Sequence, residues 1–142
     1  MKNDIDIDIT VPSNTRYLRM IGRIGEKVAQ EIDCPEGIRE ALSSQLAVVL
    51  TEGLVNAIKH ANRADPDKEI HVRINVSNKN LVVRIYDNGV GFDLDAVPSP
   101  CFTSCGMEDK GRGIFILRSL MDTVKYTRFA GGNVLEMKKN LA

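Results

Sequence analysis

The sequence has few of the residues that would point to several common classes of protein. It contains no tryptophan, three tyrosines and four phenylalanines among 142 residues, so its core must be mainly aliphatic. Lysine plus arginine equals aspartate plus glutamate at 19 each, and this balance lacks the basic excess typical of nucleic-acid-binding proteins. No apolar run approaches membrane-spanning length, and the N-terminal segment lacks the apolar centre of a signal peptide. These absences favour a cytoplasmic protein with no direct nucleic-acid or membrane partner.

Cysteine is also scarce. Cys34, Cys101 and Cys105 are too few, and odd in number, for a disulfide framework. Cys101 and Cys105 could pair or share a metal, but no second pair of that kind accompanies them, and His60 and His71 lie far away in sequence. We interpret Cys101 and Cys105 as reduced thiols in a connecting loop, in preference to a zinc site.

Hydrophobic periodicity divides the rest of the chain into strands and helices. Alternating apolar residues predict strands at Ile5–Ile9, Ile70–Val76, Leu81–Asp87, Val124–Arg128 and Val134–Lys138. Apolar residues spaced by three or four predict helices at Arg16–Ile32, Glu36–Ala61 and from Gly111 onward. Strands come mostly in adjacent pairs, so we predict one α+β domain over residues 1–142. We expect a two-layer sandwich whose mixed, mostly antiparallel sheet is covered on one face by about three helices.

The first strand carries Asp4, Asp6 and Asp8 on one face. Three aspartates in a row could suggest a metal site, but we favour a solvated edge strand whose charges discourage unwanted strand pairing. The segment Leu94–Lys110 has no hydrophobic period, and we interpret it as a long, mobile connection of the kind that is either functional or disordered.

Three polar or glycine-rich clusters could share one site. Glu52 and Asn56 lie one helical turn apart, Asp87–Gly91 (DNGVG) follows a buried strand, and Gly111–Gly113 (GRG) opens a helix. A glycine-rich helix start suits a phosphate, and an asparagine oxygen suits Mg²⁺ with its waters and substrate phosphates. A carboxylate one turn away could deprotonate an attacking hydroxyl, and the strand-end aspartate could accept from an exocyclic amine. The alternative for Asp87–Gly91 taken alone is an ordinary turn.

Rival motifs do not match. There is no GxxxxGK[ST] phosphate loop, and Gly89 with Gly91 does not complete a GxGxxG fingerprint. A calcium-binding loop over Asp87–Asp93 is excluded because glycines occupy ligand positions and Phe92 stands where glycine is required. The clusters together therefore describe a Mg–nucleotide site.

These clusters resemble three motifs of the GHKL ATPase superfamily, which includes DNA gyrase, heat-shock chaperones, histidine kinases and mismatch-repair ATPases. The matching segments are Thr51–Ala61 (TEGLVNAIKHA), Asp87–Phe92 (DNGVGF) and Gly111–Leu117 (GRGIFIL). Each is weak alone, but all three occur in order with suitable spacing. The resemblance covers nearly the whole chain, implies the Bergerat ATP-binding fold, and is greatest to the small bacterial anti-sigma factor serine-protein kinases.

The resemblance also implies roles for individual residues. Glu52 would be the catalytic base and Asn56 the Mg²⁺ ligand, while Asp87 would bind the adenine amino group. Gly89 and Gly91 would shape the adenine pocket.

Further expectations concern the phosphates. Leu94–Lys110 would form the ATP lid, and Gly111 and Gly113 would contact the phosphates. Lys59, Lys110 and Arg112 are weaker phosphate candidates, and for Arg112 a solvated helix-start charge is an equal alternative. His60 is better explained as a packed helix residue.

The implied activity is an ATP- and Mg²⁺-dependent serine-protein kinase and anti-sigma factor. Its partners would be a sigma factor or other regulated protein and a STAS-domain antagonist, which it phosphorylates, and it would be a homodimer. The alternatives are a non-catalytic, nucleotide-dependent regulator and a stand-alone histidine-kinase-type ATPase domain.

The chain departs from the family at Gly131–Asn133 (GGN), where a Gly-Thr or Gly-Ser pair is common. The hydroxyl that supports adenine binding is thus absent or replaced by Asn133.

Overall fold

The computed structural model describes residues 4–62, 65, 67–89, 109–129 and 131–142, without the side chains of residues 60–61 and 109–112. Its elements are, in chain order, β1 (Ile5–Pro12), η1 (Thr15–Tyr17), α1 (Leu18–Gln30), α2 (Glu36–Val55), η2 (Asn56–Ala61), β2 (Glu69–Ser77), β3 (Asn80–Asp87), α3 (Asp109–Leu120), β4 (Thr123–Phe129) and β5 (Gly132–Asn140).

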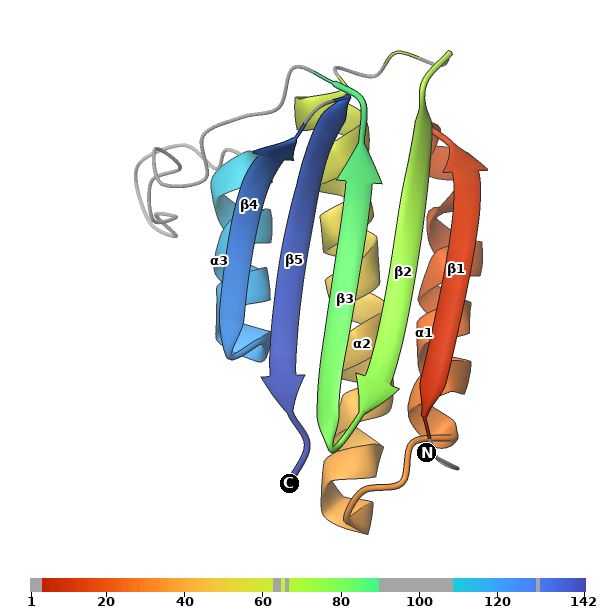
Figure 1. The fold of residues 1–142 in the computed structure, drawn as a ribbon, viewed down its shortest axis with the longest axis vertical. Helices are drawn as coiled ribbons and strands as arrows, with labels where there is room; N and C mark the ends of the chain where they lie inside the picture. The colour runs from red at the N-terminus through yellow and green to blue at the C-terminus, as the bar shows by residue number, and fades with distance from the viewer. Residues whose placement is uncertain (1–3, 63–64, 66, 90–108, 130) are drawn as a thin grey trace.

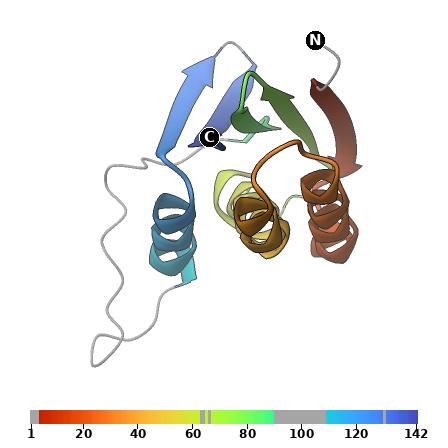
Figure 2. The same ribbon diagram turned by 90° about the horizontal axis from the view of Figure 1, so that it is seen from below.

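The strands form one sheet in the order β1-β2-β3-β5-β4. The predicted two-layer sandwich is confirmed. The sheet was predicted to be mixed, but all four of its described strand pairings are antiparallel. The α-helices lie in one layer behind the sheet (Figure 1), and Figure 2 shows the two layers end-on. The last strand, β5, lies between β3 and β4, which places the end of β3 beside the start of β5.

The core lies between the two layers and is aliphatic, as the lack of aromatics predicts. The side chains that alternate inward from β2, β3 and β5 pack against α2, the central helix. Gly53 explains how closely they pack, because a Cβ added there would lie 2.4 Å from Ile85 Cδ1. The glycine in mid-helix therefore serves close packing. The largest fully buried side chains are Ile21, Ile32, Leu42, Leu46, Leu50, Leu54, Ile70, Ile74, Leu81, Ile85, Ile114 and Leu117.

Two local features set the helix ends. Asn14 begins the first helical segment, because its side chain accepts a hydrogen bond from the backbone N–H of Arg16 at 2.9 Å. The predicted helix Glu36–Ala61 changes character at Asn56, where α2 continues as the π-helical turn η2. The wider turn ends at Asn62, whose N–H bonds the Ala57 carbonyl and whose buried amide donates to Ser13 Oγ at 3.1 Å.

The central helix also meets a length and composition criterion for a membrane span over Glu36–Lys59, which the sequence analysis did not anticipate. Half of its apolar window is buried inside the fold, where it packs on the sheet. A core helix of a globular domain has the same composition, so this helix is weak evidence for a membrane.

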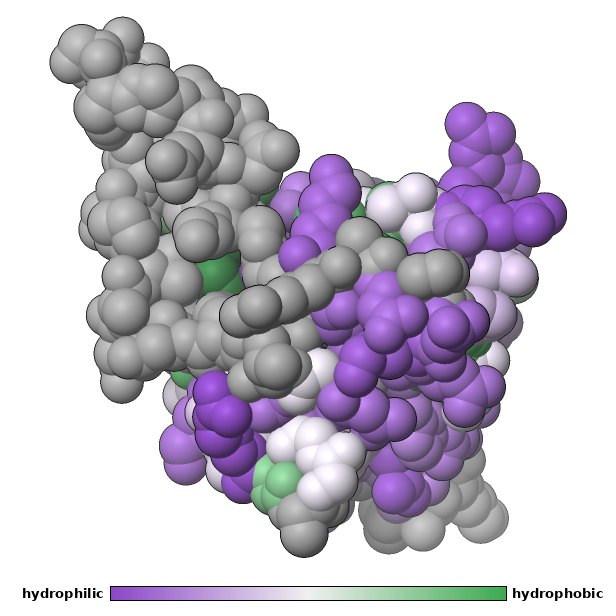
Figure 3. Space-filling model, turned by 90° about the horizontal axis from the view of Figure 1, so that it is seen from above, coloured by the Kyte–Doolittle hydropathy of each residue, from purple (hydrophilic) through white to green (hydrophobic). Residues whose placement is uncertain are grey.

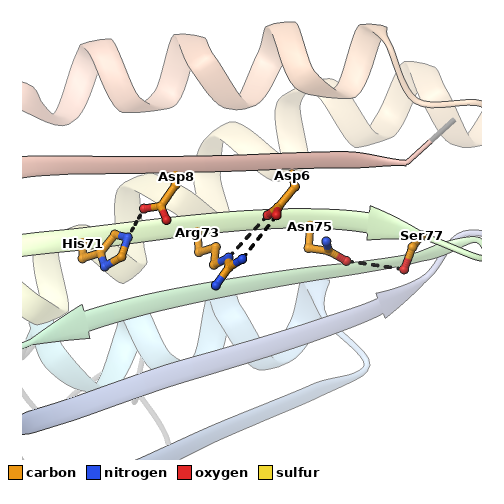
Figure 4. Close-up of polar contacts among 6 residues, drawn as sticks. All are labelled: Asp6, Asp8, His71, Arg73, Asn75 and Ser77. Atoms are coloured by element: carbon orange, nitrogen blue, oxygen red, sulfur yellow. Dashed lines mark hydrogen bonds and ion pairs between the residues drawn. The ribbon is translucent and has the colours of Figure 1, made fainter. Parts of the chain in front are cut away.

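The opposite face of the sheet is polar, and Figure 4 shows its contacts between β1 and β2. Arg73 donates to both oxygens of Asp6, and His71 pairs with Asp8. The hydrogen bond from Arg73 lowers the pKa of Asp6. The described residues contain no group of three or more metal-ligating side chains that could hold an ion. The aspartates of β1 thus form cross-strand pairs, in agreement with a solvated edge strand.

The same face gives a prediction for pH dependence. Burial alone would raise the pKa of Glu136, but the hydrogen bond from Arg84 at 2.8 Å and the nearby positive charges lower it below its ordinary 4.5. A lowered pKa in the folded state stabilises the fold above about pH 4.5 and loses that effect as the pH falls. We expect Glu136→Gln to cost about 0.2 to 1 kcal/mol at pH 7, and progressively less as the pH falls below about 4.5, by urea unfolding. A loss that does not decrease with falling pH would contradict this, and exposed Glu40→Gln is the control.

Candidate active site

The junction of α2 and η2 presents the first cluster. Asn56, the first residue of η2, is only 3% exposed, and its Nδ2 has no hydrogen-bond partner in the described structure. Buried polar atoms are nearly always satisfied, so an unpartnered one points to a ligand. Rotating the amide by 180° exchanges its oxygen and nitrogen, so the same position can offer Oδ1 to a hard cation. Asn56 therefore fits a Mg²⁺ ion that takes its other ligands from water and phosphate.

The second cluster, at the start of α3, lies against the first. The helix begins at Asp109, two residues before the predicted start at Gly111. Gly113 is buried, and a Cβ added to it would lie 3.1 Å from Glu52 Oε2. The carboxylate of Glu52, which is half-buried, is thus adjacent to the second turn of α3, next to the first turn whose free N–H groups can bind phosphate.

The third cluster is the end of β3. Asp87 is 2% exposed, and its Oδ1 accepts hydrogen bonds from Gly89 N at 2.9 Å and from Asn133 Nδ2 at 2.8 Å. The hydroxyl of Tyr126 lies 3.4 Å from Oδ2. A buried carboxylate is costly unless it is hydrogen-bonded, and these donors offset that cost.

The fold brings these clusters to one end of the molecule. The turn η2 contacts both β3 and α3, and α2 contacts α3. The C-terminal end of β3 and the end of η2 lie at the same edge (Figure 1), and Figure 3 shows that the described surface at this end is mainly hydrophilic. The helix start, the buried amide and the buried acid therefore lie at the same end of the fold.

The structure places some of the other predicted residues and leaves some outside its description. Lys59 is exposed on η2, and Gly89 is half-buried in the turn after β3. The backbone of Lys110, Gly111 and Arg112 lies in the first turn of α3. The side chains of these three residues and of His60 lie outside the described part of the structure. So does the segment 90–108, which contains Gly91, Cys101, Cys105 and most of the predicted lid.

Two residues of this site were not assigned from the sequence. In the sequence prediction Asn133 stands only as the residue that could replace the hydroxyl of the family pattern, and Tyr126 has no role. Both reach Asp87 because β5 lies between β3 and β4, with Asn133 directly opposite Asp87 in the register. The family pattern at Gly131–Asn133 is therefore a signal for Asn133, but strand order is not encoded in local periodicity, so the sequence contains no direct signal for the contact of Tyr126.

A separate groove lies between β1 and α1, away from the three clusters. It has a volume of about 940 Å³, an apolar floor and a basic rim. The floor includes Ile5, Ile7 and Ile24. The rim has four basic residues and one acid, and they are Arg16, Arg19, Arg23, Lys27 and Glu31. Its apolar floor does not offer the buried amide and carboxylate of the three clusters, so we do not place a nucleotide there.

A two-layer α+β sandwich with an asparagine-bearing helix, a strand-end aspartate and a glycine-rich helix start defines a nucleotide-binding ATPase domain of the GHKL type. The family model described as "Histidine kinase-like ATPase domain" matches residues 11–139. The chain belongs to this family.

Its curated relatives include serine-protein kinases named RsbW. The protein of Bacillus subtilis (strain 168) is 28% identical over 97% of this chain and 88% of its own length. The protein of Listeria innocua is also 28% identical, over 93% of this chain and 85% of its own length.

Solved structures of similar fold include the RsbU and RsbW domains of Rv1364c from Mycobacterium tuberculosis, with a TM-score of 0.59 and 12% identity over 96% of this chain. This chain spans 32% of that chain's length. The blue-light activated histidine kinase of Erythrobacter litoralis has a TM-score of 0.56 and 20% identity over 92% of this chain and 42% of its own.

Proposed function

We propose that the protein is an ATP-dependent serine-protein kinase and anti-sigma factor of a partner-switching system. It would bind a sigma factor or other regulated protein and phosphorylate a serine of a STAS-domain antagonist. The observation that carries this proposal is the close approach of Glu52 to α3 at Gly113, one helical turn from Asn56, whose Nδ2 has no hydrogen-bond partner among the described residues. The RsbW kinases that this chain resembles support it.

Each site residue would have its own role in phosphate transfer. Asp87 would accept a hydrogen bond from the adenine amine, and the backbone N–H groups around Gly111 and Gly113 would bind the phosphates. Asn56 would hold a Mg²⁺ ion, which when bound neutralises charge on the phosphates. Lys59, Lys110 and Arg112 would add positive charge, and Gly91 would complete the base pocket.

Glu52 would act as the base. It accepts the proton of the substrate serine hydroxyl as the serine oxygen bonds to the γ-phosphorus and the bond from that phosphorus to the β–γ bridging oxygen breaks. The products are phosphoserine and ADP. Because Glu52 is half-buried beside α3, its carboxylate lies next to the backbone that would bind the transferred phosphate.

A kinase assay tests this function. The protein, Mg–ATP and a cognate STAS protein are expected to yield phosphoserine on the STAS protein, detected by mass spectrometry and stable to acid. Acid-labile phosphohistidine would instead favour a histidine-kinase-type domain. Nucleotide binding without any phosphate transfer would contradict the kinase function and favour a nucleotide-dependent regulator.

The groove between β1 and α1 is our candidate surface for the regulated protein. Its basic rim and apolar floor fit an acidic segment with apolar side chains. We expect Arg19→Glu with Arg23→Glu to weaken binding of the regulated protein by about tenfold or more, by calorimetry, and to leave Mg–ATP affinity unchanged. Arg118→Glu with Lys125→Glu makes the same charge change outside the groove and is the control. Equal losses in the two double variants would contradict the assignment.

Three further parts of the proposal rest on the sequence. A single domain over residues 1–142 and a cytoplasmic location follow from its composition and pattern, and a homodimer follows from the resemblance alone. Light scattering on the purified protein tests the dimer, and a monomeric mass at micromolar concentration would contradict it.

A further inference from the structure

Asn133 and Asp87 form a buried pair beside the proposed base pocket. They lie directly opposite each other in the pairing of β3 with β5, and their exposed fractions are 1% and 2%. Asn133 Nδ2 donates to Asp87 Oδ1 at 2.8 Å and to the Gly89 carbonyl oxygen at 2.9 Å. One amide nitrogen thus joins the acid to the turn that follows it.

These bonds leave the two carboxylate oxygens of Asp87 unequal. Oδ1 receives the donors of both Asn133 and Gly89. Among the described residues, Oδ2 has only the Tyr126 hydroxyl, at 3.4 Å, which is long for a hydrogen bond between two oxygens. Oδ2 is therefore the oxygen with capacity to accept a strong hydrogen bond from a ligand.

The start of β5 is shaped to allow this arrangement. A Cβ added to Gly132 would lie 2.1 Å from the Asp87 carbonyl oxygen, so only glycine allows β5 to approach the end of β3 this closely. That approach brings the next residue, Asn133, within reach of both Asp87 and Gly89. A serine or threonine hydroxyl has one proton and could donate to only one of these two acceptors, whereas the amide donates to both.

We propose that Asn133 is a positioning residue that orients the Asp87 carboxylate and thereby sets the preference of the site for an aminopurine over an oxopurine nucleotide. With Oδ1 engaged, Oδ2 accepts from an exocyclic amine and repels the lone pairs of an exocyclic oxygen. The inference rests on the proposed nucleotide site and adds the residue that determines its selectivity.

The test compares ATP with inosine triphosphate, in which an oxo group replaces the exocyclic amine. Calorimetry gives the two dissociation constants with Mg²⁺ for the wild type, Asn133→Leu, Asn133→Thr and the same-strand control Asn140→Leu. We expect wild type and control to prefer ATP, Asn133→Leu to lower that preference by about tenfold, and Asn133→Thr to lower it by about threefold. A merely structural role would weaken both nucleotides equally and leave their ratio unchanged.

The possible results separate this inference from the proposed function. A wild type that binds neither nucleotide would overturn both. Binding with the same ATP preference in wild type and variants would overturn the role of Asn133 alone. If Asn133→Leu does not fold, Asn133→Thr is the deciding variant, because threonine is a good strand former and keeps one of the two donated hydrogen bonds. A ratio of the two dissociation constants that is the same in Asn133→Thr as in the wild type would then overturn the inference.

Discussion

Asp87→Asn is expected to weaken Mg–ATP binding by about 10- to 100-fold. The substitution keeps the shape of the side chain but removes the charge that the exocyclic amine of the base would meet, and a hydrogen bond to a charged group contributes about 1.5–3 kcal/mol. Because Asp87 is 2% exposed, no water can replace the lost acceptor at low cost. Calorimetric titration of the folded variant with Mg–ATP measures the effect.

The control for this variant lies on the other face of the same sheet. Asp8 pairs with His71 on the polar face, and Asp8→Asn makes the same chemical change there. We expect its Mg–ATP affinity to match that of the wild type. Circular dichroism at the titration temperature confirms that both variants are folded, and equal affinities of Asp87→Asn and wild type would exclude Asp87 from the site.

Glu52→Gln is expected to lower the rate of phosphate transfer by about 10² to 10⁴-fold, the usual contribution of a general base. The amide is isosteric and stays beside Gly113, so the dissociation constant for Mg–ATP should change by less than about threefold. Single-turnover transfer to the STAS protein measures the rate, and titration measures the binding.

The matched variant is Glu40→Gln, on the exposed side of the same helix, which should transfer phosphate at the wild-type rate. If Glu52→Gln and wild type transfer phosphate equally fast, Glu52 is not the base. If instead the switch between protein partners is unaffected when Glu52→Gln abolishes turnover, the nucleotide-dependent regulator becomes the better description.

Much of the fold follows from local pattern. Alternation of Ile70, Val72, Ile74 and Val76 predicts β2, and a turn of two residues after it closes the hairpin with β3. In that turn Asn78 has a positive φ of 49°, which asparagine tolerates better than most residues. Local sequence determines these features because neighbouring residues alone fix a strand face or a tight turn.

Features that depend on distant contacts could not be predicted in the same way. The position of β5 between β3 and β4 depends on pairing across more than forty residues of chain, and it decides which residue meets Asp87. The π turn that begins at Asn56 also depends on a distant contact. It ends at Asn62, which is hydrogen-bonded to Ser13 just after β1. The three clusters were found from residue type and spacing, but their hydrogen-bonded neighbours were not.

The central claim is that Asn56, Asp87 and the start of α3 form one Mg–ATP site. A thermal and urea unfolding series with Mg–ATP tests it most directly, because a ligand that binds only the folded state stabilises it. At about one hundred times the dissociation constant, the free energy of unfolding should rise by about 2.7 kcal/mol in the wild type and by far less in the Asn56→Ala, Asp87→Ala double variant. No rise in the wild type, or an equal rise in the double variant, would contradict the claim.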